Sequence, residues 1–237
     1  MNQIRTAHSG NRYMVLILML GFLLRILLLQ TRGTWYDDAF SIFLSGRTFP
    51  EILLVTAAIA TPPLYYILLN GWMKLGSELW ILRSLNVILS LICIFLTNIR
   101  IGRLAHPVSG LWSAFLVAIS PIHIYHAQEL RMYMLLTVSL LGYAIFFSQI
   151  WTMRPGVNRP WKVWVGFVGC GVIAMCTHNL AVFPIFVPLI VSILLRKWRI
   201  VNGVLISQAL IELFSLPWLA ILPGQIDKMQ SAFWMPR

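Results

Sequence analysis

Acidic residues are scarce in this sequence. The 237 residues contain seven Asp and Glu against eighteen Lys and Arg, and charged residues make up only 11% of the chain. Hydrophobic residues make up 59%, and the mean hydropathy is +0.81. A soluble globular protein needs a far more polar surface than this composition can supply. The composition therefore predicts a membrane protein with several spanning helices.

Cysteine is also rare, and its placement excludes two further classes of protein. Cys93, Cys170 and Cys176 all lie within apolar runs. Their spacing fits neither a metal site nor a disulfide framework. We therefore expect three buried, unreactive thiols.

The net charge of +11 raises the question of a nucleic-acid partner. The basic residues do not gather on one polar domain but separate the apolar runs from one another. This distribution is typical of charges that set membrane topology. We therefore expect membrane lipid, and no nucleic acid, around this protein.

The apolar runs predict an all-α, polytopic membrane bundle that forms a single domain over residues 1–237. We expect about seven transmembrane helices, at 13–31, 82–99, 107–122, 132–150, 163–178, 180–195 and 201–222. The first run resembles a signal peptide, but it lacks a small-x-small cleavage site and is long enough to span a bilayer. We therefore interpret it as an uncleaved helix, with Arg25 snorkelling to the interface.

Two shorter apolar pieces lie between the first two expected spans. Residues 52–60 and 64–75 are too short to cross a bilayer, so we predict interfacial helices on the outer face. With the N-terminus in the cytoplasm, ten basic residues and no acid fall in the cytoplasmic segments. The positive-inside rule favours this orientation, which places Asp37, Asp38, Glu129 and His178 on the outer side.

The pair Asp37-Asp38 follows the first span directly. Mutual repulsion and the nearby bilayer would both make one of the two carboxylates a stronger proton acceptor, and such a carboxylate could take a proton from a hydroxyl nucleophile. The structural alternative is a solvated turn or a helix N-cap, for which Asp is also favoured.

A second polar segment, residues 120–133, separates two expected spans. Arg131 offers a planar fork that suits phosphate, and Glu129 could orient it or bind a substrate hydroxyl; an interface-anchoring pair is the alternative. A divalent metal is an open alternative, since it could bind to His123, His126 and Glu129. We assign no metal ligand and no cofactor. His178 could donate a hydrogen bond, and Glu212 is the acid placed inside a span, where acids usually face a bundle interior.

These segments resemble the family 39 glycosyltransferases of the GT-C superfamily, which include the protein O-mannosyltransferases and the lipid A aminoarabinose transferase. Similar motifs occur in the same order: Trp35-Tyr36-Asp37-Asp38-Ala39, with Asp38 in place of the usual Glu; Pro62-Pro63-Leu64-Tyr65-Tyr66; Arg83; the Ser120–Tyr133 segment; and Thr177-His178. Thr61 departs from the His or Lys that relatives often carry. Relatives continue through further spans, so the resemblance implies that residues 1–237 are an N-terminal portion of such a protein.

The resemblance implies a membrane-embedded glycosyltransferase in a bacterial cytoplasmic membrane. It would transfer a sugar from a polyprenyl-phosphate donor to a hydroxyl of an unknown acceptor on the outer face. Asp37 would be the general base, supported by Asp38. Arg131 would be the first choice, and Arg83 the second, for the residue that binds the phosphate. Two alternatives are a transporter or flippase for a lipid-linked solute that uses Glu212 and Arg25, and a truncated GT-C fold without catalytic activity.

Overall fold

The computed structural model describes residues 2–27, 29, 33–59, 61–152 and 160–219, with the backbone alone described for residues 2–10. Every element in these ranges is a helix, which confirms the expected all-α class. The α-helices are α1 (Asn2–Ile26), α2 (Tyr36–Ser45), α3 (Phe49–Ala58), α4 (Leu64–Trp72), α5 (Leu79–Leu104), α6 (Pro107–Ile119), α7 (Pro121–Ala127), α8 (Tyr133–Trp151), α9 (Trp161–Met175), α10 (Val182–Leu194) and α11 (Trp198–Leu219), with short 3₁₀ turns η1 (Met73–Leu75) and η2 (Asn179–Ala181).

Several of these helices could cross a membrane. In the described ranges, α5, α8 and α11 are long and apolar enough, and α6 with α7 would make a fourth span despite a bend of 62° between them. The expected boundaries of these spans agree with the helices to within a few residues, apart from the bend. Seven spans were expected, whereas α9 and α10 are shorter apolar helices. The first expected span, residues 13–31, is helical up to Ile26. Residues 28, 30 and 31 of this span lie outside the described residues, and so do residues 220–222 of the last expected span.

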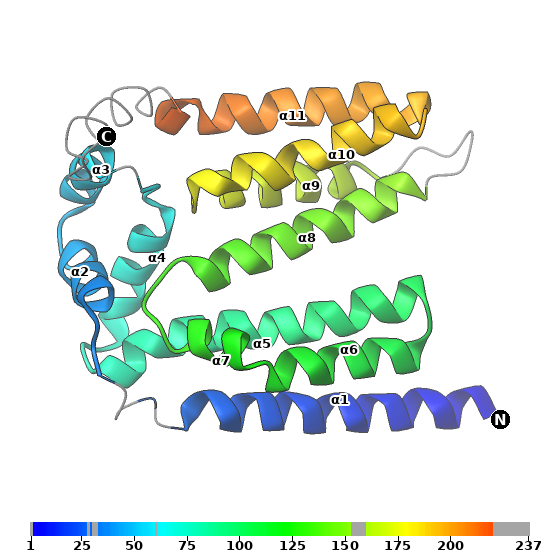
Figure 1. Cartoon of the computed structure of the whole chain (residues 1–237), viewed down its shortest axis with the longest axis horizontal. Helices are drawn as coiled ribbons and strands as arrows, with labels where there is room; N and C mark the ends of the chain where they lie inside the picture. The colour runs from blue at the N-terminus through cyan, green and yellow to red at the C-terminus, as the bar shows by residue number, and fades with distance from the viewer. Residues whose placement is uncertain (1, 28, 30–32, 60, 153–159, 220–237) are drawn as a thin grey trace, which may run out of the picture. The chain divides into compact units, whose positions relative to one another are not determined.

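The chain forms two compact units. The first contains residues 1–43 and 69–141, and the second contains residues 44–68 and 142–237. In the first unit α1, α5 and α6 lie side by side, and α7 contacts all three (Figure 1). In the second unit α11 packs against α9 and α10 (Figure 1).

Helix α5 is the central element of the first unit. Its buried face carries apolar residues, among them Leu82, Leu85 and Ile94, but also polar ones. Small residues bring α5 and α6 close together: a Cβ on Gly110 would lie 2.5 Å from the Asn98 carbonyl oxygen. Such close approach of backbones is a common way to pack helices where lipid gives no hydrophobic drive.

Aromatic packing joins the helices of the second unit. The Tyr143 and Phe167 rings stack with centroids 4.2 Å apart, and the Tyr143 hydroxyl donates to the Ile185 carbonyl oxygen at 2.8 Å. The start of α3 is fixed locally, because the Glu51 carboxylate accepts from the N–H and the hydroxyl of Thr48. These hydrogen bonds lower the pKa of Glu51.

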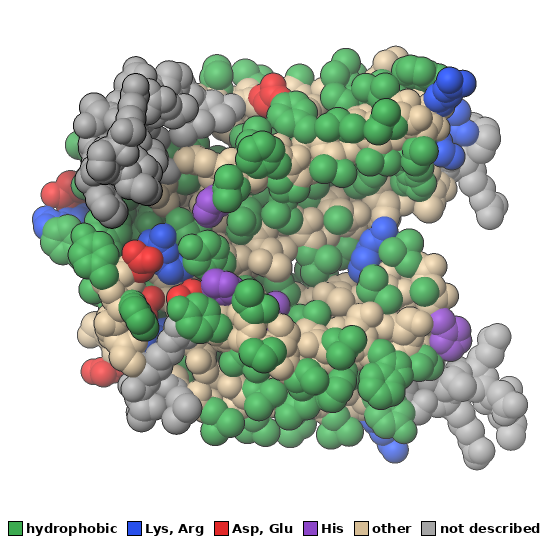
Figure 2. Space-filling model, viewed as in Figure 1, with side chains coloured by type: hydrophobic (Ala, Val, Ile, Leu, Met, Phe, Trp, Pro, Cys, Tyr) green, Lys and Arg blue, Asp and Glu red, His purple; other side chains and the backbone are tan. Residues whose placement is uncertain are grey.

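The outer flanks of the helices are apolar. On α1, Leu16, Met19 and Leu23 are more than half exposed, and on α11 so are Ile206 and Phe214. Figure 2 shows hydrophobic side chains spread along the visible flank of α1. An apolar flank on a helix of spanning length is typical of contact with lipid, in agreement with the expected membrane protein.

Candidate functional site

The two neighbouring aspartates have opposite environments. Both lie in the first turn of α2, where the helix dipole favours negative charge. Asp38 is 1% exposed, whereas the Asp37 side chain is 62% exposed. Consecutive helix residues point about 100° apart, so one carboxylate faces the packed interior and the other faces outward. Neither residue is the N-cap that the sequence left as an alternative, because α2 begins before them, at Tyr36, and Asp37 remains accessible for chemistry.

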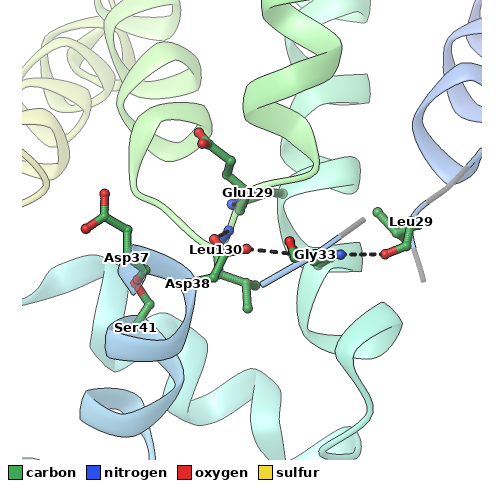
Figure 3. A network of polar contacts seen from close by, with 9 residues as sticks. Leu29, Gly33, Asp37, Asp38, Ser41, Glu129 and Leu130 are labelled. Atoms are coloured by element: carbon green, nitrogen blue, oxygen red, sulfur yellow. Dashed lines mark hydrogen bonds and ion pairs between the residues drawn. The ribbon is translucent and has the colours of Figure 1, made fainter. Parts of the chain in front are cut away.

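Asp38 is held by two partners from distant parts of the chain. Its Oδ2 accepts from Nη2 of Arg83 at 3.1 Å. Its Oδ1 accepts from the N–H of Leu130, which lies beside it in Figure 3, at 2.8 Å. Arg83 is itself fully buried, and it donates to the carbonyl oxygens of Leu29 and Gly33. The pair therefore binds the start of α2 to α5 and to the loop after α7.

That loop, residues 128–132, is held by three of its backbone groups and by the side chain of Gln128. The Asn86 amide donates to the carbonyl oxygens of Glu129 and Arg131, while Asp38 binds the N–H of Leu130 between them. The Gln128 amide donates to the carbonyl oxygens of Arg25 and Leu27 at 3.0 and 2.9 Å. Side chains that project from such a fixed backbone are preorganised, as a binding or catalytic site requires.

Glu129 and Arg131 project from this loop beside Asp37. Figure 3 shows the carboxylates of Asp37 and Glu129 pointing the same way. Nη1 of Arg131 lies 3.9 Å from Oδ1 of Asp37, and the Arg131 side chain is 18% exposed. The loop thus brings an accessible cation next to an accessible carboxylate.

His126 extends this group of polar side chains. Its Nδ1 lies 2.8 Å from Oε2 of Glu129. The ring also lies against two aromatic neighbours, Tyr125 and Tyr133, with centroids 5.3 and 4.8 Å away. His126 and Glu129 therefore form a hydrogen-bonded pair next to the Asp37–Arg131 contact.

Arg25 does not snorkel to the interface as expected; it is fully buried. Its Nε donates to the Ser90 hydroxyl, Nη1 donates to the carbonyl oxygens of Gly21 and Ala118, and Nη2 donates to the Val117 oxygen and to Nδ1 of His123. A guanidinium has five N–H groups, and all five are used. The expectation that its guanidinium reaches out to the interface is wrong, because the end of α6 supplies carbonyl acceptors close by.

The other expected site residues are placed as follows. His178 lies in the second unit, where it caps η2 and its Nδ1 accepts from the Leu180 N–H at 3.1 Å. Glu212 lies on α11 in the same unit. Asp37, Asp38, Arg83, Glu129 and Arg131 all belong to the first unit. Within the described ranges no three His, Cys, Asp or Glu side chains are grouped to hold a metal ion.

The sequence reasoning missed Asn86, Ser90 and Gln128. Arg83, Asn86 and Ser90 are spaced i, i+3, i+7, which puts them on one face of α5, and all three are fully buried. Polar residues at helical spacing inside an apolar run were the signal that could have shown this face. Gln128 stands in a loop and offered no such periodicity.

Comparison with protein-family models, with curated proteins and with solved structures gives no match.

Proposed function

We propose that the chain is a membrane-embedded glycosyltransferase that moves a sugar from a polyprenyl-phosphate carrier to an acceptor hydroxyl. The main support is the contact between Asp37 and Arg131, which projects from a loop held in place by hydrogen bonds of Asp38, Asn86 and Gln128. A carboxylate and a cation, both accessible, are the two groups that this transfer needs.

The proposed reaction has one bond made and one broken at the anomeric carbon. The acceptor oxygen attacks this carbon, the bond to the phosphate oxygen breaks, and polyprenyl phosphate leaves. Asp37 takes the proton of the acceptor hydroxyl as a general base. Arg131 meets the charge that develops on the leaving phosphate, for which its planar fork is suited.

The burial of the two arginines supports this division of roles. Arg83 is fully buried, and its guanidinium binds Asp38 and two carbonyl oxygens. Arg131 is partly exposed and lies beside Asp37. We therefore assign the phosphate to Arg131, and we assign to Arg83 and Asp38 the positioning of the loop and of α2.

The topology is part of the same proposal. The site would lie on the outer face of a bacterial cytoplasmic membrane, with a cytoplasmic N-terminus, and the shorter helices α9 and α10 would complete a bundle of about seven spans. A donor carried by a membrane lipid suits a reaction centre that lies near the end of α1 and beside the bend between α6 and α7.

The geometry favours a transferase over a transporter. The transporter hypothesis used Arg25 as an intramembrane solute site, but every N–H group of Arg25 already has an acceptor within the first unit. An arginine in this state has no donor left for a solute. It serves instead to join α1, α5 and α6.

The test is sugar transfer in liposomes by the protein, expressed in its complete reading frame. Polyprenyl phosphates that carry radiolabelled mannose, glucose, galactose or arabinose serve as donors, and membrane extracts serve as the source of acceptors. Asp37→Asn should lower transfer by about 10²–10⁴-fold. Glu78→Gln, which removes another exposed carboxylate, should have no effect. Folded parent protein that transfers none of these sugars would refute the proposal.

A further inference from the structure

His126 has a defined hydrogen-bonding state because of its partner. Its Nδ1 lies 2.8 Å from the Glu129 carboxylate, and an ionised carboxylate can only accept a hydrogen bond. In the neutral ring Nδ1 therefore carries the proton, and Nε2 keeps its lone pair. Glu129 in this way fixes both the orientation of the imidazole and its tautomer.

His123, three residues earlier, has the opposite tautomer. Its Nδ1 faces Nη2 of Arg25 at 3.0 Å, and an arginine can only donate. Nδ1 of His123 therefore accepts, and its proton lies on the buried Nε2. Of these two histidines in α7, His126 is the one that offers an acceptor nitrogen at the surface, since 29% of its side chain is exposed.

The surroundings of His126 suit a sugar ring. The Tyr125 and Tyr133 rings both lie beside the imidazole, with centroids 5.3 and 4.8 Å away, and Tyr125 is 45% exposed. Apolar faces together with a few fixed polar atoms are typical of small-ligand sites, and the C–H face of a sugar packs well on an aromatic ring. A hydroxyl on the same sugar could donate to Nε2 of His126.

We infer that His126, Glu129, Tyr125 and Tyr133 form a sugar-binding subsite in which Nε2 of His126 accepts a hydrogen bond from one hydroxyl of the donor sugar. The inference rests on the proposed function for the identity of the ligand, and it adds a specificity-determining residue that neither the resemblance nor the sequence pattern assigned. Asp37 and Arg131 act at the anomeric carbon and the phosphate, whereas His126 selects the sugar.

The first test measures binding without transfer. Diethyl pyrocarbonate modifies neutral imidazoles, and mass spectrometry measures the modification rate of each histidine in the liposome-embedded protein. A saturating polyprenyl-phosphate sugar, at about ten times its Kd, should slow modification of His126 by about 10-fold. Polyprenyl phosphate alone should slow it by less than about 2-fold. His106 is exposed and caps α6, so its rate should not change with either ligand.

Three results would overturn the subsite. Equal protection by the sugar-bearing and sugar-free lipids would mean that the lipid or its phosphate covers His126. No protection by any of the four donors would mean that no sugar from this class binds there. Protection that persists at the same level in Glu129→Ala would show that the tautomer set by Glu129 has no part in binding.

The second test measures specificity. Selectivity of the parent protein between donors that differ at one hydroxyl is compared with that of His126→Gln. We expect selectivity at one ring position to fall about 10-fold, which corresponds to the net free energy of one hydrogen bond. His106→Asn keeps a capping side chain and should leave selectivity unchanged. An equal loss of rate with every sugar would contradict a role in selection.

The two proposals fail in different ways. Protection of His126 by a sugar without any transfer would leave the subsite standing and refute the transferase. Transfer that depends on Asp37, with unchanged selectivity in His126→Gln, would refute the subsite and leave the transferase standing.

Discussion

Arg25 and Gln128 each cap the end of a helix other than their own. The Gln128 amide donates to the carbonyl oxygens of Arg25 and Leu27 at the end of α1, while the Arg25 guanidinium donates to the carbonyl oxygens of Val117 and Ala118 at the end of α6. The last carbonyl groups of a helix have no partner within the helix, and in the interior of a membrane bundle water supplies none. The hydrogen bonds from Arg25 explain how α6 can end at Ile119 and the chain can bend by 62° into α7.

Replacing Arg25 should therefore destabilise the first unit. Arg25→Gln cannot reach all five acceptors, and buried carbonyl groups left without a donor cost about 1–3 kcal/mol each. We expect a loss of at least about 3 kcal/mol in the free energy of unfolding, measured by denaturant titration in detergent micelles. Arg103→Gln, at an exposed position near the end of α5, is the matched control. Equal stability of the two variants would refute a capping role for Arg25.

Asp38 and Arg83 should behave as one energetic unit. Removing one member of a buried ion pair costs about 3–5 kcal/mol, because the other charge is left without compensation. Asp38→Asn and Arg83→Met should each destabilise the fold by about this amount, and the double variant should lose much less than the sum. Asp37→Asn is the control, since Asp37 is largely exposed. A double-mutant cycle with additive losses would contradict the pairing.

Arg131 should affect the use of the donor more than the stability of the fold. Arg131→Lys keeps the charge but loses the planar fork, and a hydrogen bond to a charged group contributes about 1.5–3 kcal/mol. We expect kcat/KM for the polyprenyl-phosphate sugar to fall by about 10-fold or more, with an unchanged melting temperature. If donor kinetics match those of the parent, Arg131 is an interface anchor and does not meet the phosphate.

The proposed topology predicts which loops are accessible from outside the cell. A cysteine at Ala105, in the basic loop after α5, should be protected from an impermeant thiol reagent in intact cells and should react after permeabilisation. A cysteine at Gly46, after α2, should react in intact cells. Both are made with Cys93, Cys170 and Cys176 replaced by alanine, so that one thiol is present. Labelling at position 105 in intact cells would reverse the orientation and place Asp37 in the cytoplasm.

The local features of the fold were predictable from the sequence. The all-α class and the positions of α5, α8 and α11 follow from hydropathy and run length, because a helix in lipid satisfies its own backbone and needs no information from distant residues. The end of a span was expected at residue 122, but the 62° bend between α6 and α7 was not expected. The residues of the candidate site were also predicted from local patterns. These were the rare acidic residues between apolar runs, and Arg131 two residues after Glu129.

The tertiary structure decided what each of these residues does. Asp37 and Asp38 are chemically identical neighbours, and only the packing of α2 buries one against Arg83 and leaves the other exposed. Arg25 was expected to snorkel to the membrane interface, but its side chain is buried among the helices because residues 117 and 118, more than ninety positions away, supply its acceptors. Hydropathy depends on neighbours along the chain, whereas hydrogen-bond partners depend on neighbours in space. The sequence alone therefore determined the helices and the set of candidate polar residues. The packing of α1, α5, α6 and α7 determined which of those residues are buried and hold the site in place, and which remain exposed.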